Sequence, residues 1–91
     1  MSTYSGPATV IADGAEYRVT AHLTLTVSGG LKEWSGSLEA ENEEAAWTIY
    51  QAEDAKLRTD HAREGAFISV RYSPPASDLD IQGSGPAPFG N

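Results

Sequence analysis

Hydrophobic and polar residues alternate along residues 15–27, where every second side chain is apolar. The apolar set consists of Tyr17, Val19, Ala21, Leu23, Leu25 and Val27. The residues between them are polar: Arg18, Thr20, His22, Thr24 and Thr26. Because successive side chains of a strand point to opposite faces, this period of two predicts an antiparallel strand with one buried face.

A second alternating run covers residues 31–40, after the turn residues Ser28-Gly29-Gly30. Its inward positions are Trp34, Gly36, Leu38 and Ala40. We expect Gly36 to mark a bend or to leave room for a facing ring. The first run is long for an open sheet, whereas a strand of a barrel can reach this length because it bends.

Four further stretches have strand-like sequences, namely 7–12, 55–59, 66–72 and 78–83. Asp13-Gly14 follows the first of them and is a strong hairpin signal. The pattern predicts a mostly β protein: a small antiparallel β-barrel, or a strongly curved sheet, of about six strands with one short helix. We expect a single domain over residues 1–91, with 1–3 and 86–91 as loose ends.

The helix is predicted at residues 42–52. Asn42 is suited to an N-cap, and Glu43 and Glu44 would stand in the first turn, where negative charge is favourable. The broad apolar face of such a helix consists of Ala45, Ala46, Ile49, Tyr50 and Ala52. The alternative is a strand with Ala45, Trp47 and Ile49 inward.

The tetrapeptide Ser-Gly-Pro-Ala occurs at residues 5–8 and again at residues 84–87. Glycine permits a tight bend and proline ends the donation of ladder hydrogen bonds, so each copy can stop a terminal strand. We expect the first and last strands to pair antiparallel and to close the barrel. A phosphate-binding loop is disfavoured, because no Lys-Ser or Lys-Thr follows the glycines.

The chain has 91 residues, no cysteine and a formal net charge of −7. The lack of cysteine excludes disulfides and thiol chemistry. The N-terminus lacks the features of a secretory signal, and no apolar run approaches the length that crosses a bilayer. We therefore expect a soluble cytoplasmic protein that binds neither nucleic acid nor membranes, and whose acidic surface suits a basic protein partner.

Residues suited to catalysis or metal binding are few. His22 lies on the polar face of the long strand, and His61 lies in a turn without a zinc-ligand spacing. Asp78 and Asp80 hint at a calcium loop, but Phe89 stands where such a loop needs Glu. We expect no metal, no cofactor and no catalytic residue. An enzyme would require His22, His61 and a carboxylate to converge.

Aromatic residues give the better clue to function, since Trp and Tyr combine apolar area with a polar tip and are favoured at interfaces. We expect Trp34, Tyr17 and Phe67 in the core. The candidate partner-binding residues lie in less regular segments and are Trp47, Tyr50, Phe89, Arg63 and His61.

Five short segments together resemble small uncharacterised β domains of actinobacteria and their phages. These segments are GPA (6–8), ADG (12–14), WSGSL (34–38), LRTDHAREG (57–65) and GSGPAPF (83–89). The resemblance implies a bacterial or phage origin and a cytosolic setting, and it carries no known activity.

The main functional hypothesis is a non-catalytic protein-binding or regulatory module. One alternative is a small-ligand-binding barrel, with a cavity lined by Trp34 and Tyr17 and the helix as a lid. The other alternative is an enzyme that uses His22 and His61. A homo-oligomer is compatible with a core this small.

Overall fold

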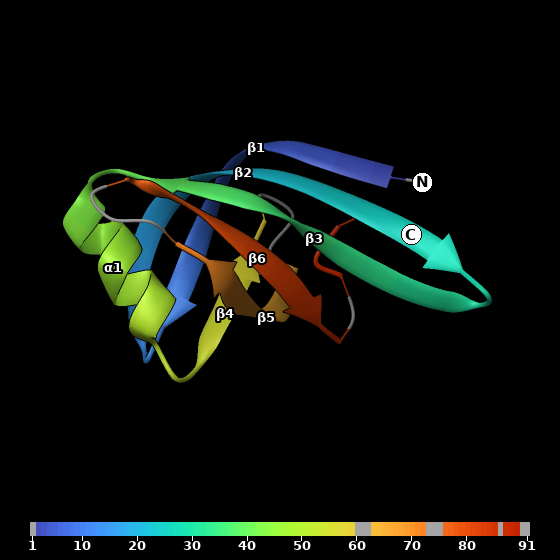
Figure 1. The fold of residues 1–91 in the computed structure, drawn as a ribbon. Helices are drawn as coiled ribbons and strands as arrows, with labels where there is room; N and C mark the ends of the chain where they lie inside the picture. Colours follow the sequence, from blue (N-terminus) through green and yellow to red (C-terminus); the bar gives the residue numbers. More distant parts are fainter. Residues whose placement is uncertain (1, 60–62, 73–75, 86, 90–91) are drawn as a thin grey trace.

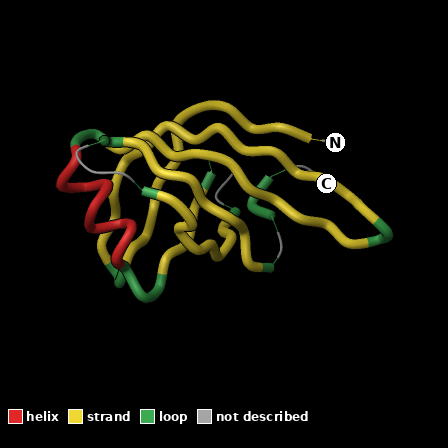
Figure 2. Tube along the Cα trace, in the orientation of Figure 1, coloured by secondary structure: helices red, strands yellow, loops and turns green. Residues whose placement is uncertain are grey.

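The chain folds into a closed barrel of six antiparallel strands with one helix, as the sequence predicts (Figures 1 and 2). The computed structural model describes residues 2–59, 63–72, 76–85 and 87–89. In chain order the elements are β1 (Ser2–Ala12), β2 (Ala15–Ser28), β3 (Leu31–Ala40), α1 (Glu43–Gln51), β4 (Ala55–Arg58), β5 (Glu64–Arg71) and β6 (Asp78–Ser84).

The barrel closes between β1 and β4, and its strand order is β1-β2-β3-β6-β5-β4. Residues Thr9–Ala12 of β1 pair with β4. The backbone N–H of Asp13 donates to the carbonyl of Asp54 (2.9 Å), and Asp13 Oδ1 accepts from the N–H of Asp54 (3.0 Å). These bonds fix the start of β4 beside the β1–β2 turn.

The predicted pairing of the first and last strands is therefore wrong. Strand β6 lies between β3 and β5, and no register joins it to β1 among the described residues. Within the first Ser-Gly-Pro-Ala, Gly6 and Pro7 continue strand β1, whereas Ser84 of the second ends β6. The repeated tetrapeptide thus does not mark two stops that lie side by side.

The predicted loose ends are also ordered where the structure describes them. Ser2 and Thr3 belong to β1, because β2 is long enough to pair with β1 as far as Ser2 opposite Leu25. Near the C-terminus, Pro88 and Phe89 are buried. The hydroxyl of Thr59 donates to the carbonyl of Pro88 (2.9 Å), which ties this segment to the end of β4.

The alternating pattern of β2 and β3 forms the core as predicted. Val19, Leu23, Leu25 and Leu38 are all buried, and each burial removes apolar area from water. Trp34 and Phe67 are buried as well, and Tyr17 is partly buried against the core. Beyond the reach of β6, the β2–β3 hairpin extends as an arm whose tip leaves Val27 and Leu31 exposed (Figure 1).

Two glycines permit close approaches within the barrel. A Cβ at Gly36 would lie 2.0 Å from the carbonyl oxygen of His22 on the neighbouring strand. A Cβ at Gly83 would lie 2.0 Å from the Trp34 ring. Room for a ring is therefore left by Gly83, whereas Gly36 lets two backbones come together.

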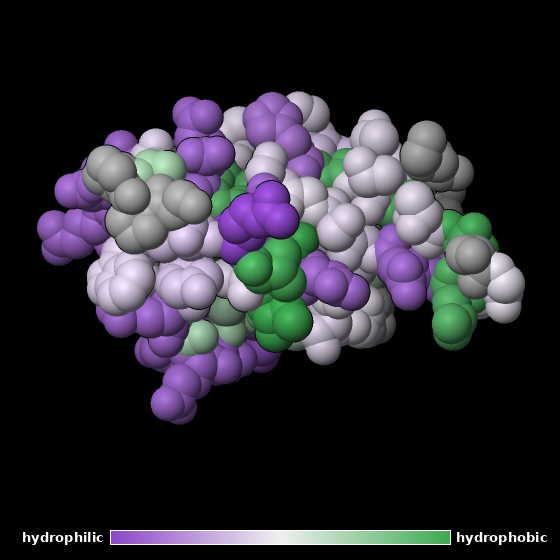
Figure 3. Space-filling view, in the orientation of Figure 1, coloured by the Kyte–Doolittle hydropathy of each residue, from purple (hydrophilic) through white to green (hydrophobic). Residues whose placement is uncertain are grey.

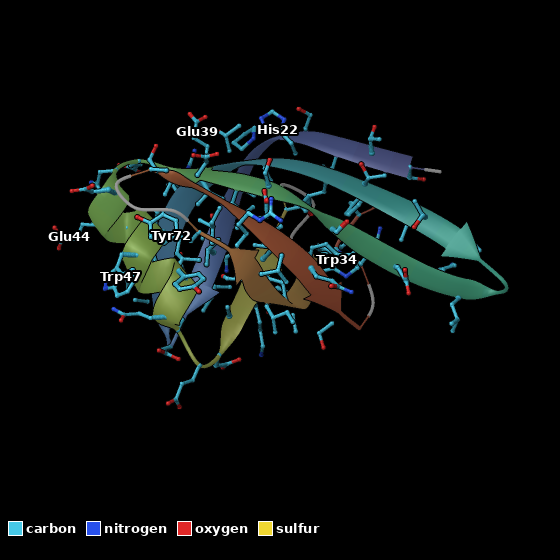
Figure 4. All side chains as sticks on the ribbon, viewed as in Figure 1. His22, Trp34, Glu39, Glu44, Trp47 and Tyr72 are labelled. Atoms are coloured by element: carbon cyan, nitrogen blue, oxygen red, sulfur yellow. The ribbon has the colours of Figure 1, made fainter. Side chains whose placement is uncertain are left out.

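Helix α1 begins at the predicted cap and covers one end of the barrel. Asn42 Oδ1 accepts from the N–H of Ala45 (2.8 Å), with Glu43 and Glu44 in the first turn. Ala46 and Ile49 are buried, and the helix packs against β1, β3, β5 and β6. Trp34 lies on the opposite side of the barrel, away from α1 (Figure 4).

Candidate functional site

Three aromatic rings form a cluster on the outer side of α1. Trp47 and Tyr50 come from successive turns of the helix, and Tyr72 directly follows β5. The ring centroids lie 5.9 Å apart for Trp47 and Tyr50, 6.1 Å for Trp47 and Tyr72, and 5.4 Å for Tyr50 and Tyr72. Trp47 is 46% exposed and Tyr50 is 39% exposed. We call these residues the aromatic triad.

A β-bulge directs Tyr72 toward the helix. The register between β5 and β6 shifts between Ser69 and Arg71, so one additional residue is inserted in β5. An inserted residue moves the side chains beyond it to the other face of the strand. Phe67 before the bulge points into the core, Arg71 after it is exposed, and Tyr72 contacts α1.

The Tyr72 hydroxyl anchors its ring to the start of the helix by donating to the carbonyl of Glu43 (3.3 Å). Partial burial of the ring and the nearby Glu43 carboxylate both raise the pKa of the Tyr72 phenol above its usual value of about 10. The phenol is therefore neutral at physiological pH and serves as a hydrogen-bond donor.

Two carboxylates adjoin the aromatic triad. Glu43 precedes Trp47 by four residues and Glu44 precedes it by three, which places both on neighbouring positions of the helix surface. Glu43, Glu44, Trp47 and Tyr72 line an open hollow of about 530 Å³. Figure 4 shows Trp47 and Tyr72 on the outer side of α1, with Glu44 at its N-terminal end.

A second, more polar hollow of about 400 Å³ lies on the other side of Glu44. Its lining includes Glu16, Arg18, Glu41 and Asn42. Glu44 lines both hollows and so stands between them. The start of α1 is thus an acidic ridge between an aromatic hollow and a polar one.

Exposed apolar residues continue this surface on β5. Ile68 is 58% exposed and Val70 is 53% exposed, and Val70 is the inserted residue of the bulge that precedes Tyr72. Figure 3 shows an apolar area in the middle of this face, over β5 and β6. Clustered apolar exposure next to polar residues is typical of protein-binding surfaces.

The structure places the predicted partner-binding residues in different regions. Trp47 and Tyr50 lie together in the triad. Arg63 is exposed near the opposite end of β5, where its carbonyl accepts from the N–H of Thr59 (3.0 Å). His61 lies outside the described residues.

Phe89 is buried, so its predicted exposure is wrong. Its ring packs edge-on against Trp34, at a centroid distance of 6.3 Å, and also contacts Tyr4. The barrel end opposite α1 carries apolar surface that this ring covers.

Sequence reasoning missed Tyr72, because the bulge that turns its ring toward α1 leaves no local sequence signal.

His22 lies on the outer face of β2, where its Nδ1 is 2.8 Å from the hydroxyl oxygen of Ser5 on β1. The convergence of His22 with His61, which the enzyme alternative requires, stays an untested hypothesis. Across the residues that the structure describes, no group of three His, Asp or Glu residues is arranged to hold a metal ion.

The space around Trp34 is filled. Its indole contacts Gly83 on one side and Phe89 on another, and its Nε1–H donates to the carbonyl of Gly85 (3.2 Å). These contacts surround the indole at the place where the small-ligand-binding alternative would put its ligand. Tyr17 lines the polar hollow on the outside instead.

Fold and surface together define a small closed β-barrel with a buried apolar core and an exposed aromatic and acidic helix face. Residues 1–90 match the family described as "Domain of unknown function (DUF4873)", and the chain belongs to this family. No curated protein and no solved structure matches the chain. Within the described ranges, none of the helical structure has the length and apolar character needed to span a membrane.

Proposed function

We propose that this protein is a non-catalytic protein-binding module that uses the outer side of α1 to hold a basic segment of a partner protein. The observation that carries the proposal is the aromatic triad, which packs into one exposed surface beside Glu43 and Glu44. In keeping with the sequence resemblance, we place this module in the cytoplasm of a bacterium or in a phage, with a regulatory role.

The ring positions support binding rather than a purely structural role. Trp and Tyr dominate binding energy at protein interfaces, because they bury large area at little entropic cost. A helix that served only the barrel would need Ala46 and Ile49, which are already buried. Trp47 and Tyr50 add aromatic area on the side that faces water.

Charge favours a basic partner over a second copy of the chain. The formal net charge is −7, and Glu41, Glu43 and Glu44 surround the start of α1. Two such faces would repel each other, whereas a lysine- or arginine-containing segment would be attracted and steered to this face.

A peptide array tests the proposal. Wild-type protein and the Trp47→Ala variant are applied to immobilised peptides that vary in basic and apolar content, and hits are measured by fluorescence anisotropy. We expect peptides that combine basic and apolar residues to bind the wild type, and Trp47→Ala to weaken binding about tenfold or more, as loss of an interface hot spot does.

Val27→Ala is the matched control, because Val27 is an exposed apolar residue on the hairpin arm, away from α1. Binding by this variant should equal that of the wild type. Equal binding by Trp47→Ala and wild type, or no preference for basic peptides, would refute the proposal. Sedimentation of the pure protein measures whether a second copy of the chain binds to the α1 surface in place of a partner.

A further inference from the structure

We infer that the aromatic hollow recognises the guanidinium group of an arginine in the partner, which stacks on Trp47 and Tyr72 while Glu43 and Glu44 accept its hydrogen bonds. This inference rests on the proposed function and names the chemical group that the site takes. It depends on three observations: the tilt of the rings, the position of the carboxylates and the charges already present nearby.

The ring geometry favours a flat cation. The planes of the triad are tilted by 32° for Trp47 and Tyr50, 41° for Trp47 and Tyr72, and 43° for Tyr50 and Tyr72. None of these three pairs is close to perpendicular, so the rings do not stand as walls around a common centre. A cage that encloses a round quaternary ammonium needs ring faces on several sides of it, whereas a planar guanidinium stacks on a shallow aromatic surface.

The carboxylates suit the same group. Glu43 and Glu44 line the hollow together with Trp47 and Tyr72. Guanidinium presents several N–H donors in one plane, and carboxylates accept them in pairs while the face of the cation stays on the rings. The Tyr72 phenol donates a hydrogen bond to the carbonyl of Glu43, and this bond holds the Tyr72 ring in the lining of the hollow.

Arg18, Arg58 and Arg71 are not among the residues that line the aromatic hollow. Arg71 lines a neighbouring small hollow with Asp78 and Asp80, which Tyr72 also lines. Arg58 forms ion pairs with Glu16 (3.1 Å) and Glu64 (4.0 Å). Arg18 lines the polar hollow, which Glu16, Glu41 and Glu44 also line. The aromatic hollow itself is lined by two carboxylates and two rings, so its charge calls for a cation from outside.

Tryptophan fluorescence tests the inference with small probes. Trp47 is exposed whereas Trp34 is 2% exposed, so quenching by a solute reports mainly on Trp47. The probes are N-acetyl-arginine amide, N-acetyl-lysine amide and tetramethylammonium chloride, each titrated at constant ionic strength. We expect saturable quenching by the arginine probe, with an affinity about fivefold above that of the lysine probe, as one extra stacking contact gives.

Variants that retain Trp47 localise the effect. Tyr72→Leu and the double variant Glu43→Gln/Glu44→Gln should each weaken the arginine probe about threefold or more, which corresponds to one lost cation–π or charged contact. The matched control is Glu33→Gln/Glu39→Gln, which changes net charge equally at exposed positions on β3. This control should bind like the wild type, and circular dichroism confirms that each variant is folded.

The outcomes separate the two proposals. Equal affinities for arginine and lysine probes, or tightest binding of tetramethylammonium, would overturn the guanidinium assignment and leave the protein-binding function standing. Equal loss in the control and in Glu43→Gln/Glu44→Gln would also overturn it, since unspecific charge attraction would then explain binding. Absence of binding by every probe and by every basic peptide of the array would overturn both proposals.

Discussion

Gly83→Ala is expected to destabilise the barrel strongly, although it adds a single methyl group. The new Cβ would lie 2.0 Å from Cε2 and 2.1 Å from Nε1 of Trp34, whereas carbon atoms in contact lie roughly 3.5–4.0 Å apart. The indole cannot swing away freely, because it is 2% exposed, packs against Phe89 and donates to the carbonyl of Gly85.

The expected cost has two parts. Overpacking a core site costs about 1–3 kcal/mol, and displacing the buried indole from its hydrogen bond costs about 1–2 kcal/mol more. A chain of 91 residues has a free energy of unfolding of roughly 5–14 kcal/mol. The variant therefore loses a large part of its stability, and its Tm falls by about 10–30 °C.

Urea denaturation followed by circular dichroism and Trp fluorescence measures this cost. Ser84→Ala is the control, because Ser84 is the exposed neighbour of Gly83 and its replacement should change stability by less than about 0.5 kcal/mol. In the double variant Gly83→Ala/Trp34→Leu the methyl group occupies space that the indole vacates, so the two changes should be coupled by about 1 kcal/mol or more. Wild-type stability of Gly83→Ala, with unchanged Trp34 emission, would refute the packing argument.

Three further predictions concern the helix cap, the edge of β1 and the triad. Asn42→Ala should lower the free energy of unfolding by about 1 kcal/mol in thermal denaturation, whereas Asn42→Asp should keep the cap; equal stability of the two would contradict this. Pro7→Val should cause concentration-dependent association in sedimentation experiments. Strand β4 pairs with only the last residues of β1, and Pro7, whose carbonyl accepts from the Tyr4 hydroxyl, prevents another strand from pairing with the rest of that edge. A monomer at all concentrations would contradict this prediction. The raised pKa of Tyr72 contributes stability below a pH of about 10, and this stability is lost as the pH rises through the folded-state pKa. The free energy of unfolding of Tyr72→Phe should therefore fall less steeply with alkaline pH than that of the wild type. Identical pH dependences of the two proteins would argue against the raised pKa.

The sequence predicted those elements whose signals are local and periodic. The alternation from Tyr17 to Ala40 determined the buried faces of β2 and β3, since a shift by one residue would expose every apolar side chain. The Asn42 cap and the two glutamates correctly predicted the start of α1 against the strand alternative. These features depend on neighbours within a few residues.

Strand order and the triad depended on contacts between distant residues. Closure by β4 arises from its pairing with β1 and from two hydrogen bonds between Asp13 and Asp54, one of them to the Asp13 carboxylate, which no pairing rule for terminal strands anticipates. Trp47 and Tyr50 were proposed because aromatic residues are favoured at interfaces and these two lie in a less regular segment of the sequence, but Tyr72 joins them through a bulge in β5. Phe89 was misassigned because the apolar barrel end that it covers is formed only after folding.

Chemical-shift mapping by NMR tests the central claim most directly. Uniformly ¹⁵N-labelled protein is titrated with the tightest-binding basic peptide of the array, and the amide shifts are mapped onto the barrel. The account predicts saturable shifts concentrated on α1 and on the end of β5 around Tyr72, with little change on the outer face around His22. Shifts centred on that outer face or on the hairpin arm, with α1 unaffected, would contradict it.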